Sequence, residues 1–373
     1  MDRALTLLHI ESHNQWAGQE RRVVTECRWM ADQGHRVHLA APPNTPVSDR
    51  ARAAGISVHP IRFLPRTLPS DLFRVRRLIR RLQPDVINPH GNRDGKAALL
   101  AAAGLHVSCV IRSRHVSIPV RNTRYNRLLY GRLCHRVFTT SRKSAAQLVR
   151  DLGIPAERVH FVPSGIVPPA VLPDRNETRR ALAAAWGLPE TGRWIGFVGR
   201  LSAEKGISLL ITALARLAAE MSDLRLVLVG RGGEAESLRV QARAAGVADR
   251  VILTGFQEDP WPWHRALDVE VLPSLCGEGV PQSVLEAMHA GCPVIGSWDG
   301  GIPDIVRHGE TGLLFPVGDA EELTQALRSA LADPAAAAQR AETARGMVAD
   351  RHTIHAMGRQ ILDIYQQVRN GGC

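Results

Sequence analysis

The sequence predicts an α/β protein of two similar domains, each with a parallel sheet that carries helices on both faces. Two observations support this prediction. The chain has 373 residues with 45% hydrophobic content, which is enough for two cores of ordinary domain size. Short apolar runs also alternate with longer amphipathic stretches along nearly the whole chain, which is typical of repeated strand–helix units.

The first half of the chain begins with a buried strand and then repeats this alternation. The predicted strands are 5–10, 37–40, 58–61, 85–88, 109–112, 137–140 and 159–162, and the predicted helices are 19–32 and 71–82. Ligands bind beyond the carboxyl ends of parallel strands, so residues in the segments that follow strands are candidates for binding. Gly18, His90 and the segment 112–115 meet this condition.

The second half restarts the same rhythm after a stretch of prolines and short polar residues at 168–177, which predicts a linker. We therefore expect a first domain at 1–167 and a second at 168–353. The predicted strands of the second domain are 194–198, 224–229, 251–254, 269–272 and 293–297. Its predicted helices run from 207 to about 219, then 281–290, 320–331 and 335–348, and a last helix at 354–368 follows.

The segment from 269 to 315 is the most informative part of the chain. A short apolar strand is followed by a loop and by a helix for which Pro281 is the expected first residue and Gly291 the expected end. Such a helix directs its free N–H groups toward the edge of the sheet, which favours a phosphate there.

Two carboxylates flank this helix start, Glu278 in the loop and Glu286 about two turns later. A carboxylate accepts two hydrogen bonds side by side, so the pair suits the vicinal hydroxyls of a sugar or a ribose. Spacing alone equally allows Glu286 to be a solvated helix residue and Glu278 a loop charge.

The ordered string Glu278-Gly279-Val280-Pro281, Leu285-Glu286-Ala287-Met288, Gly291-Cys292-Pro293-Val294 and Gly309-Glu310-Thr311-Gly312 resembles the nucleotide-sugar site of the family-4 retaining glycosyltransferases. This family is also called glycosyl transferases group 1. The resemblance implies the GT-B fold, in which two Rossmann-like domains face a cleft. It also implies that the terminal segment 354–373 crosses back to the first domain.

The resemblance assigns roles to individual residues. Arg200 and Lys205 match the family's diphosphate-binding loop, and a fixed arginine and lysine are also what a diphosphate needs. Glu278 would hold hydroxyls of the donor sugar and Glu286 those of the ribose, while His115 would reach the transferred sugar. The resemblance assigns further contacts with the donor to Gly18, Gly279, Val280 and Pro281. The family's glycine pair is here Ala17-Gly18, so one glycine is missing.

The reaction implied is transfer of a glycosyl unit from a UDP-, GDP- or ADP-sugar to a glycan or lipid-linked acceptor, with retention at the anomeric carbon. Neither a metal ion nor a cofactor is expected, because Arg200, Lys205 and the helix start can neutralise the departing diphosphate. The acceptor side would belong to the first domain. Synthesis of lipopolysaccharide or of another surface glycan is the expected context.

Charge is distributed unevenly along the chain. Residues 1–167 hold 27 lysines and arginines against 11 acidic residues, a formal charge of +16, whereas the rest of the chain has a charge of −5. Arginines alternate with apolar residues in 71–82 and 121–136, which favours contact with anionic lipid. We therefore expect a peripheral protein at the inner face of the plasma membrane. The six cysteines show no metal-ligand spacing, so reduced thiols in the cytoplasm are expected.

Several alternatives remain open at this stage. Residues 230–235 satisfy the dinucleotide fingerprint, but the acidic residue expected about 20 positions later is not evident, so the glycines are interpreted as turn and packing residues. A retaining glycoside hydrolase would need two carboxylates but no diphosphate clamp. An epimerase or a phosphorylase of the same fold would differ at the acceptor side. A nucleic-acid-binding protein would need more aromatic residues for stacking and a recognisable motif.

Overall fold

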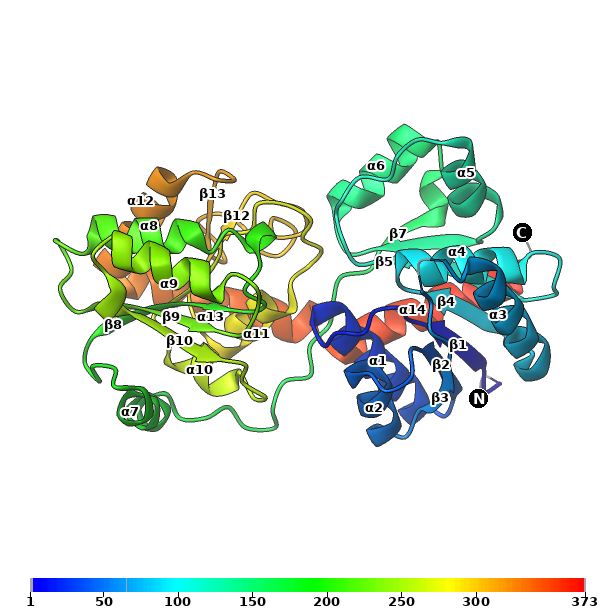
Figure 1. Ribbon diagram of the computed structural model, residues 1–373, viewed down its shortest axis with the longest axis horizontal. Helices are drawn as coiled ribbons and strands as arrows, with labels where there is room; N and C mark the ends of the chain where they lie inside the picture. The colour runs from blue at the N-terminus through cyan, green and yellow to red at the C-terminus, as the bar shows by residue number, and fades with distance from the viewer. Residues whose placement is uncertain (1–2, 65, 372–373) are drawn as a thin grey trace. The chain divides into compact units, whose positions relative to one another are not determined.

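The structure is a computed structural model that describes residues 3–64 and 66–371. Its contacts divide the chain into two compact units, residues 1–167 together with 354–373, and residues 168–353 (Figure 1). Each unit is a parallel sheet with helices on both faces, which confirms the predicted α/β class. Cys373, one of the six cysteines, lies outside the described residues, and the other five are free thiols.

The first unit contains seven strands, which form one sheet in the order β3-β2-β1-β4-β5-β6-β7 with every neighbouring pair parallel. Its elements are β1 (Thr6–Ile10), α1 (Gly18–Asp32), β2 (Arg36–Ala41), α2 (Pro46–Ala53), β3 (Ser57–Pro60), α3 (Leu68–Leu82), β4 (Val86–Pro89), α4 (Asn92–Ala102), β5 (Cys109–Arg114), α5 (Arg124–Arg127), η1 (Leu128–Arg132), β6 (Arg136–Thr139), α6 (Arg142–Leu152), η2 (Ala156–Arg158), β7 (Val159–Phe161) and α14 (Ile354–Asn370).

A hydrophobic core lies on each face of this sheet, because successive side chains of a strand point to opposite sides. Leu7 of β1 belongs to the core that contains Trp29 and Tyr365, whereas Leu8 belongs to the core that contains Val75 and Leu99. Helices α1 and α14 therefore cover one face, and α3 and α4 cover the other.

The C-terminal helix α14 is part of the first unit. Trp29 Nε1 of α1 donates a hydrogen bond to His355 Nδ1 (2.8 Å), and Asn88 Nδ2 of β4 donates one to the hydroxyl of Tyr365 (2.9 Å). A Cβ at Gly358 would overlap the indole ring of Trp29, so glycine lets the two helices approach closely.

The second unit has a six-stranded parallel sheet in the order β10-β9-β8-β11-β12-β13. Its elements are α7 (Arg175–Trp186), β8 (Arg193–Val198), η3 (Ala203–Lys205), α8 (Ser208–Leu217), β9 (Leu224–Val229), α9 (Ala235–Ala244), η4 (Ala248–Arg250), β10 (Val251–Gly255), α10 (Trp261–Ala266), β11 (Val269–Leu272), α11 (Gln282–Ala290), β12 (Val294–Ser297), β13 (Leu313–Phe315), α12 (Ala320–Ala332) and α13 (Pro334–Arg351).

The sequence prediction did not include helices α2, α4, α6, α7, α9 and α10 or strand β13, and two of its details were wrong. Pro281 is not the first helical residue but the N-cap of α11, with extended backbone angles (φ −77°, ψ 126°), and the helix begins at Gln282. The segment expected as a linker at 168–177 becomes helical at Arg175, because the side chain of Asp174 caps α7 by accepting from the N–H of Glu177 (2.9 Å).

Candidate functional site

The strand order of the second unit reverses between β8 and β11, and such a switch point is where open α/β sheets bind ligands. The loop after β8 carries Arg200 and Lys205, and the loop after β11 carries Glu278. The two loops touch, since Gly206 has φ +62° and a Cβ there would overlap the carbonyl oxygen of Pro273. The fold therefore brings the residues of the two loops together.

Glu278 is held from three sides and is 8% exposed. Its Oε1 accepts a hydrogen bond from Ser274 Oγ (2.6 Å) and forms an ion pair with the ammonium of Lys205. Its backbone N–H donates to Asp299 Oδ2 (3.0 Å). Glu278 is thus a fixed, largely buried carboxylate rather than a freely solvated loop charge.

Arg200 lies in the same loop as Lys205 but is more open to solvent, with 47% of its side chain exposed. Its Nη2 donates to Glu204 Oε1 at 2.8 Å, and the hydroxyl of Ser202 donates to the same oxygen at 2.7 Å. Lys205 is 21% exposed at its side chain. The loop after β8 therefore holds two cations, one paired with Glu204 and one with Glu278.

The start of α11 adjoins Glu278. Val280 is 4% exposed, and Gly279 lies so close to Gly301 that a Cβ at Gly301 would collide with the Gly279 carbonyl group. The N–H of Gly301 also donates to the carbonyl oxygen of Glu278 (3.0 Å). The loop that follows β12 therefore fixes the backbone leading into the helix, whose first turn directs N–H groups outward.

Glu286 is not a solvated helix residue, because it is only 3% exposed. Its Oε2 lies 3.4 Å from Nε2 of His264 in α10, and Nδ1 of the same ring lies 2.6 Å from Oε2 of Glu270 in β11. The three side chains form a buried row of carboxylate, imidazole and carboxylate, here called the Glu270–His264–Glu286 triad.

The triad keeps its histidine charged. Burial opposes the charged form, but the carboxylates of Glu270 and Glu286 outweigh burial and raise the pKa of His264 to about 9. Sequence reasoning missed His264 and Glu270. A charged residue within the apolar strand at 269–272 was a signal, because a buried carboxylate requires a partner.

The glycines of the dinucleotide fingerprint serve backbone packing. A Cβ at Gly230 would overlap the carbonyl oxygen of Gly199, and one at Gly232 would overlap that of Leu201. The turn after β9 is therefore filled by the backbone of the turn after β8, as the interpretation of these glycines as packing residues requires.

In the first unit, Gly18 and His115 lie at the carboxyl edge of the sheet. Gly18 is the first residue of α1, and the N–H of Ala17, the N-cap, donates to Glu20 Oε2 (2.9 Å). His115 directly follows β5, and its Nε2 lies 2.9 Å from Nδ1 of His90. Burial, together with the charges of Arg22 and other nearby cations, lowers the pKa of His115 well below its usual value, so the ring is neutral near pH 7.

Three buried carboxylates form a second group at this edge, here called the acidic cluster: Glu11, Glu20 and Asp94. Glu11 is 0% exposed, and Oε1 lies 2.7 Å from Nδ1 of His13. The hydrogen bond with Glu11 outweighs burial and raises the pKa of His13 to about 9. This cluster could not be predicted from the sequence, because its members come from three separate segments.

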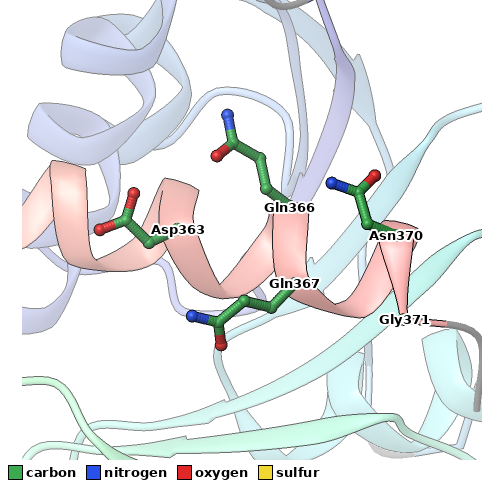
Figure 2. A pocket seen from close by; sticks show the side chains of 5 residues that line it. All are labelled: Asp363, Gln366, Gln367, Asn370 and Gly371. Carbon is green, nitrogen blue, oxygen red and sulfur yellow. The ribbon is translucent and has the colours of Figure 1, made fainter.

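A shallow depression also lies on α14 (Figure 2), lined by Asp363, Gln366, Gln367, Asn370 and Gly371. One carboxylate and three amides line it, and no cation is among these lining residues. It therefore does not resemble a diphosphate site.

Two family models match the chain. Residues 178–347 match the model described as Glycosyl transferases group 1, and residues 16–168 match Glycosyltransferase Family 4. Each matched range falls almost entirely within one of the two units.

Curated relatives agree with these matches. The chain is 35% identical to the 2-deoxystreptamine glucosyltransferase of Streptomyces kanamyceticus over 62% of its length and 60% of the relative's length. It is 28% identical to the alpha-D-kanosaminyltransferase of the same organism over 91% of the chain and 97% of that relative. It is also 35% identical to the lipopolysaccharide core biosynthesis mannosyltransferase LpcC of Rhizobium leguminosarum bv. viciae, over 43% of the chain and 47% of the relative.

Solved structures match the fold over the whole chain. A glycosyltransferase from Rickettsia africae aligns with a TM-score of 0.87 at 16% identity and covers 100% of both chains. HepE of Anabaena, crystallised with UDP and glucose, aligns with a TM-score of 0.86 at 21% identity over 97% of this chain and 99% of HepE. With two matching family models and relatives of one activity, the chain belongs to the group 1, family 4 glycosyltransferases of the GT-B fold.

Proposed function

We propose that this glycosyltransferase moves a hexosyl-type sugar, with retention at the anomeric carbon, from a nucleoside diphosphate sugar to a hydroxyl of a glycan or lipid-linked acceptor. The observation that carries the proposal is the contact of Lys205 with Glu278 at the switch point of the second sheet, beside the start of α11. This contact supports the proposal, because a cation suited to a phosphate and a carboxylate suited to sugar hydroxyls lie next to each other.

In the proposed reaction the bond between the anomeric carbon and the diphosphate oxygen breaks, and a bond from that carbon to the acceptor oxygen forms. Arg200, Lys205 and the N–H groups at the start of α11 stabilise the charge that develops on the diphosphate. The acceptor hydroxyl gives its proton to the departing phosphate oxygen on the same face of the sugar. No metal ion takes part in this proposal.

Glu278 would bind hydroxyls of the donor sugar, and Glu286 would bind the ribose. Gly279, Val280 and Pro281 would contribute backbone contacts. Gly18 would add a further donor contact, and His115 would reach the transferred sugar. HepE was solved with UDP-glucose, and a relative from Mycolicibacterium smegmatis is named as GDP-mannose-dependent. Both names support a sugar nucleotide as the donor here.

A lipid-linked acceptor is supported by the surface of α3. Phe73 is 65% exposed beside Arg74, Arg77 and Arg81, which are exposed as well. An exposed aromatic ring among arginines suits an anionic membrane surface. No helix in the described ranges is long and apolar enough to cross a bilayer. We place the protein in the cytoplasm, peripherally bound to the inner face of the plasma membrane, in lipopolysaccharide or related glycolipid synthesis.

A second acceptor class is a cationic aminocyclitol, which the acidic cluster would attract. Two relatives are named for transfer to 2-deoxystreptamine. Transfer to 2-deoxystreptamine but not to uncharged inositol, weakened at least tenfold by Glu11→Gln, would support this class. Equal use of both acceptors would exclude it.

The reaction itself is tested by following the product. Proton NMR should show the anomeric configuration of the donor retained in the glycoside, with unchanged rates in excess chelator. An inverted product would refute retention, and loss of activity in chelator would refute metal independence. Formation of an epimer or of a sugar phosphate, without any glycoside, would instead identify an epimerase or a phosphorylase.

A further inference from the structure

Three histidines form a continuous row across the carboxyl edge of the first sheet. His9 lies near the end of β1, His90 follows β4 and His115 follows β5, and these three strands are neighbours in the order β1-β4-β5. Nδ1 of His9 lies 3.0 Å from Nε2 of His90, and Nδ1 of His90 lies 2.9 Å from Nε2 of His115. The rings are stacked, with centroids 5.3 and 5.2 Å apart. This row is called the histidine chain below.

All three rings are neutral. Burial lowers the pKa of His9 to about 4, and burial lowers those of His90 and His115 well below the usual value. Arg22 and Arg112 add to the effect at the latter two rings. Each neutral ring has one N–H donor and one bare nitrogen that accepts.

Because each of the three rings is neutral, their tautomers depend on one another. Two N–H groups occupy the two contacts within the chain, so the third must lie at one end, on His9 Nε2 or on His115 Nδ1. Among the described residues, these two end nitrogens are buried and have no hydrogen-bond partner. The chain therefore has two states, and a change at one end reverses the proton positions in all three rings.

A carboxylate stands at one end of the chain. Glu26 of α1 is 1% exposed, and its Oε1 lies 3.8 Å from Nδ1 of His9. Burial raises the pKa of Glu26 to about 7, so its carboxylate is ionised above that pH. The negative charge then favours a proton on Nδ1 of His9, which in turn places the His90 proton on Nδ1 and the His115 proton on Nδ1. His115 then offers an N–H donor for which the described residues supply no hydrogen-bond partner.

We propose that the histidine chain sets the tautomer of His115, with Glu26, His9 and His90 acting as positioning residues that make His115 Nδ1 a hydrogen-bond donor to an oxygen of the bound sugar. The sugar as the ligand rests on the proposed function, whereas the coupling of tautomers does not. A buried N–H donor without a hydrogen-bond partner costs free energy. The Nδ1–H group of His115 would therefore bind a sugar oxygen more favourably than a solvated N–H donor would.

The coupling is measured by ¹⁵N NMR of the imidazole nitrogens in donor-free protein, with His115 assigned by its loss in His115→Asn. Glu26→Gln should lower the fraction of His115 that is protonated at Nδ1. In a His90→Asn background the same Glu26→Gln change should have no effect, because the chain is interrupted. An unchanged His115 tautomer in Glu26→Gln, or an equal change in both backgrounds, would overturn the proposal.

A matched control lies in the same unit. His59 Nε2 and His38 Nδ1 are 3.2 Å apart on β3 and β2, so His59→Asn also breaks a contact between two histidines. It should leave the His115 spectrum unchanged. A response equal to that of His90→Asn would show a general disturbance of the domain and would contradict the proposal.

Function and metal content complete the test. His90→Asn should lower kcat/KM for transfer about tenfold while the folding midpoint and the binding of free nucleotide stay near wild type, and His59→Asn should not. A wild-type kcat/KM in His90→Asn would overturn the role in catalysis.

Ligand atoms of His9, Glu26 and His90 all lie within 4.8 Å of one another, so metal analysis is required. A stoichiometric divalent ion lost in His90→Asn would replace the proposal with a metal site.

If no sugar nucleotide binds the wild-type protein, the proposed function fails. The NMR coupling remains measurable in that case, so the two failures are distinguishable.

Discussion

Nδ1 of His264 lies 2.6 Å from Oε2 of Glu270, and both side chains are almost completely buried. With Glu286 on the other side of the ring, a single imidazolium lies between two carboxylates inside the second unit. The helix that carries Glu286 is thereby tied to α10 and β11, which fixes a carboxylate assigned to the ribose.

The triad predicts a pH dependence of stability. The pKa of His264 is raised from 6.5 to about 9, so the folded state binds a proton that the unfolded state releases. This stabilisation is fully present below pH 6.5 and is lost as the pH rises through 9. We expect the free energy of unfolding of the wild type to fall by about 2–3 kcal/mol between pH 6.5 and pH 10.

Urea denaturation at several pH values checks this prediction. His264→Gln should have a lower free energy of unfolding than the wild type at pH 6.5. Between pH 6.5 and pH 10 this free energy should decline much less in the variant than in the wild type. Parallel pH profiles for the wild type and the variant would show that His264 is not charged in the folded protein.

Loss of either cation in the loop after β8 should weaken donor binding. Arg200→Ala and Lys205→Ala are each expected to raise the Kd for the sugar nucleotide about ten- to a hundredfold, because each removes a charge-assisted contact to the diphosphate. Arg216→Ala is the matched control, since Arg216 also pairs with a glutamate at 2.8 Å on the surface of this unit. If calorimetric titration gives both loop variants wild-type affinity for the sugar nucleotide, Arg200 and Lys205 do not belong to the site.

The two glutamates should be separable by ligand. Glu286→Gln is expected to weaken the binding of free nucleoside diphosphate and of intact sugar nucleotide alike, because both contain the ribose. Glu278→Gln should mainly weaken the intact sugar nucleotide. The affinity of each variant for both ligands is measured by titration. If Glu278→Gln loses equal affinity for the free nucleoside diphosphate and the intact sugar nucleotide, the role of Glu278 is misassigned.

Membrane binding should depend on α3. Arg77→Glu with Arg81→Glu is expected to reduce sedimentation with phosphatidylglycerol vesicles at low salt, and Phe73→Ser should reduce it further. The control Arg180→Glu with Arg239→Glu changes the same number of charges on helices α7 and α9 of the second unit. Binding that is indifferent to lipid charge, or is reduced equally by the control, would point to a soluble acceptor.

Most strands could be predicted from the sequence, because a buried parallel strand is a short apolar run between turn residues. The run at 224–229 coincides with β9. Helix α4 was missed, because its N-cap is Gly91, which has no side chain to signal a helix start. The carboxylate of Asp94 accepts from the N–H groups of His90 and Gly91, while the segment itself is rich in alanine and has little polar contrast.

The candidate site shows the same division. Glu278 and Lys205 could be found because the motif that contains each of them is continuous in sequence. His264, Glu270 and the histidine chain could not, because their members meet only when separate strands and helices are placed side by side. His90 and His115, for example, are 25 residues apart and come together because β4 and β5 are neighbours.

A panel of UDP-, GDP- and ADP-sugars, scored by thermal shift and by slow hydrolysis, tests the central claim most directly. At least one sugar nucleotide should raise the Tm of the wild-type protein and be hydrolysed, and Lys205→Ala should abolish both effects at the same ligand concentration. If no sugar nucleotide changes the Tm and none is hydrolysed, the second unit does not bind such a donor and the proposed function is wrong.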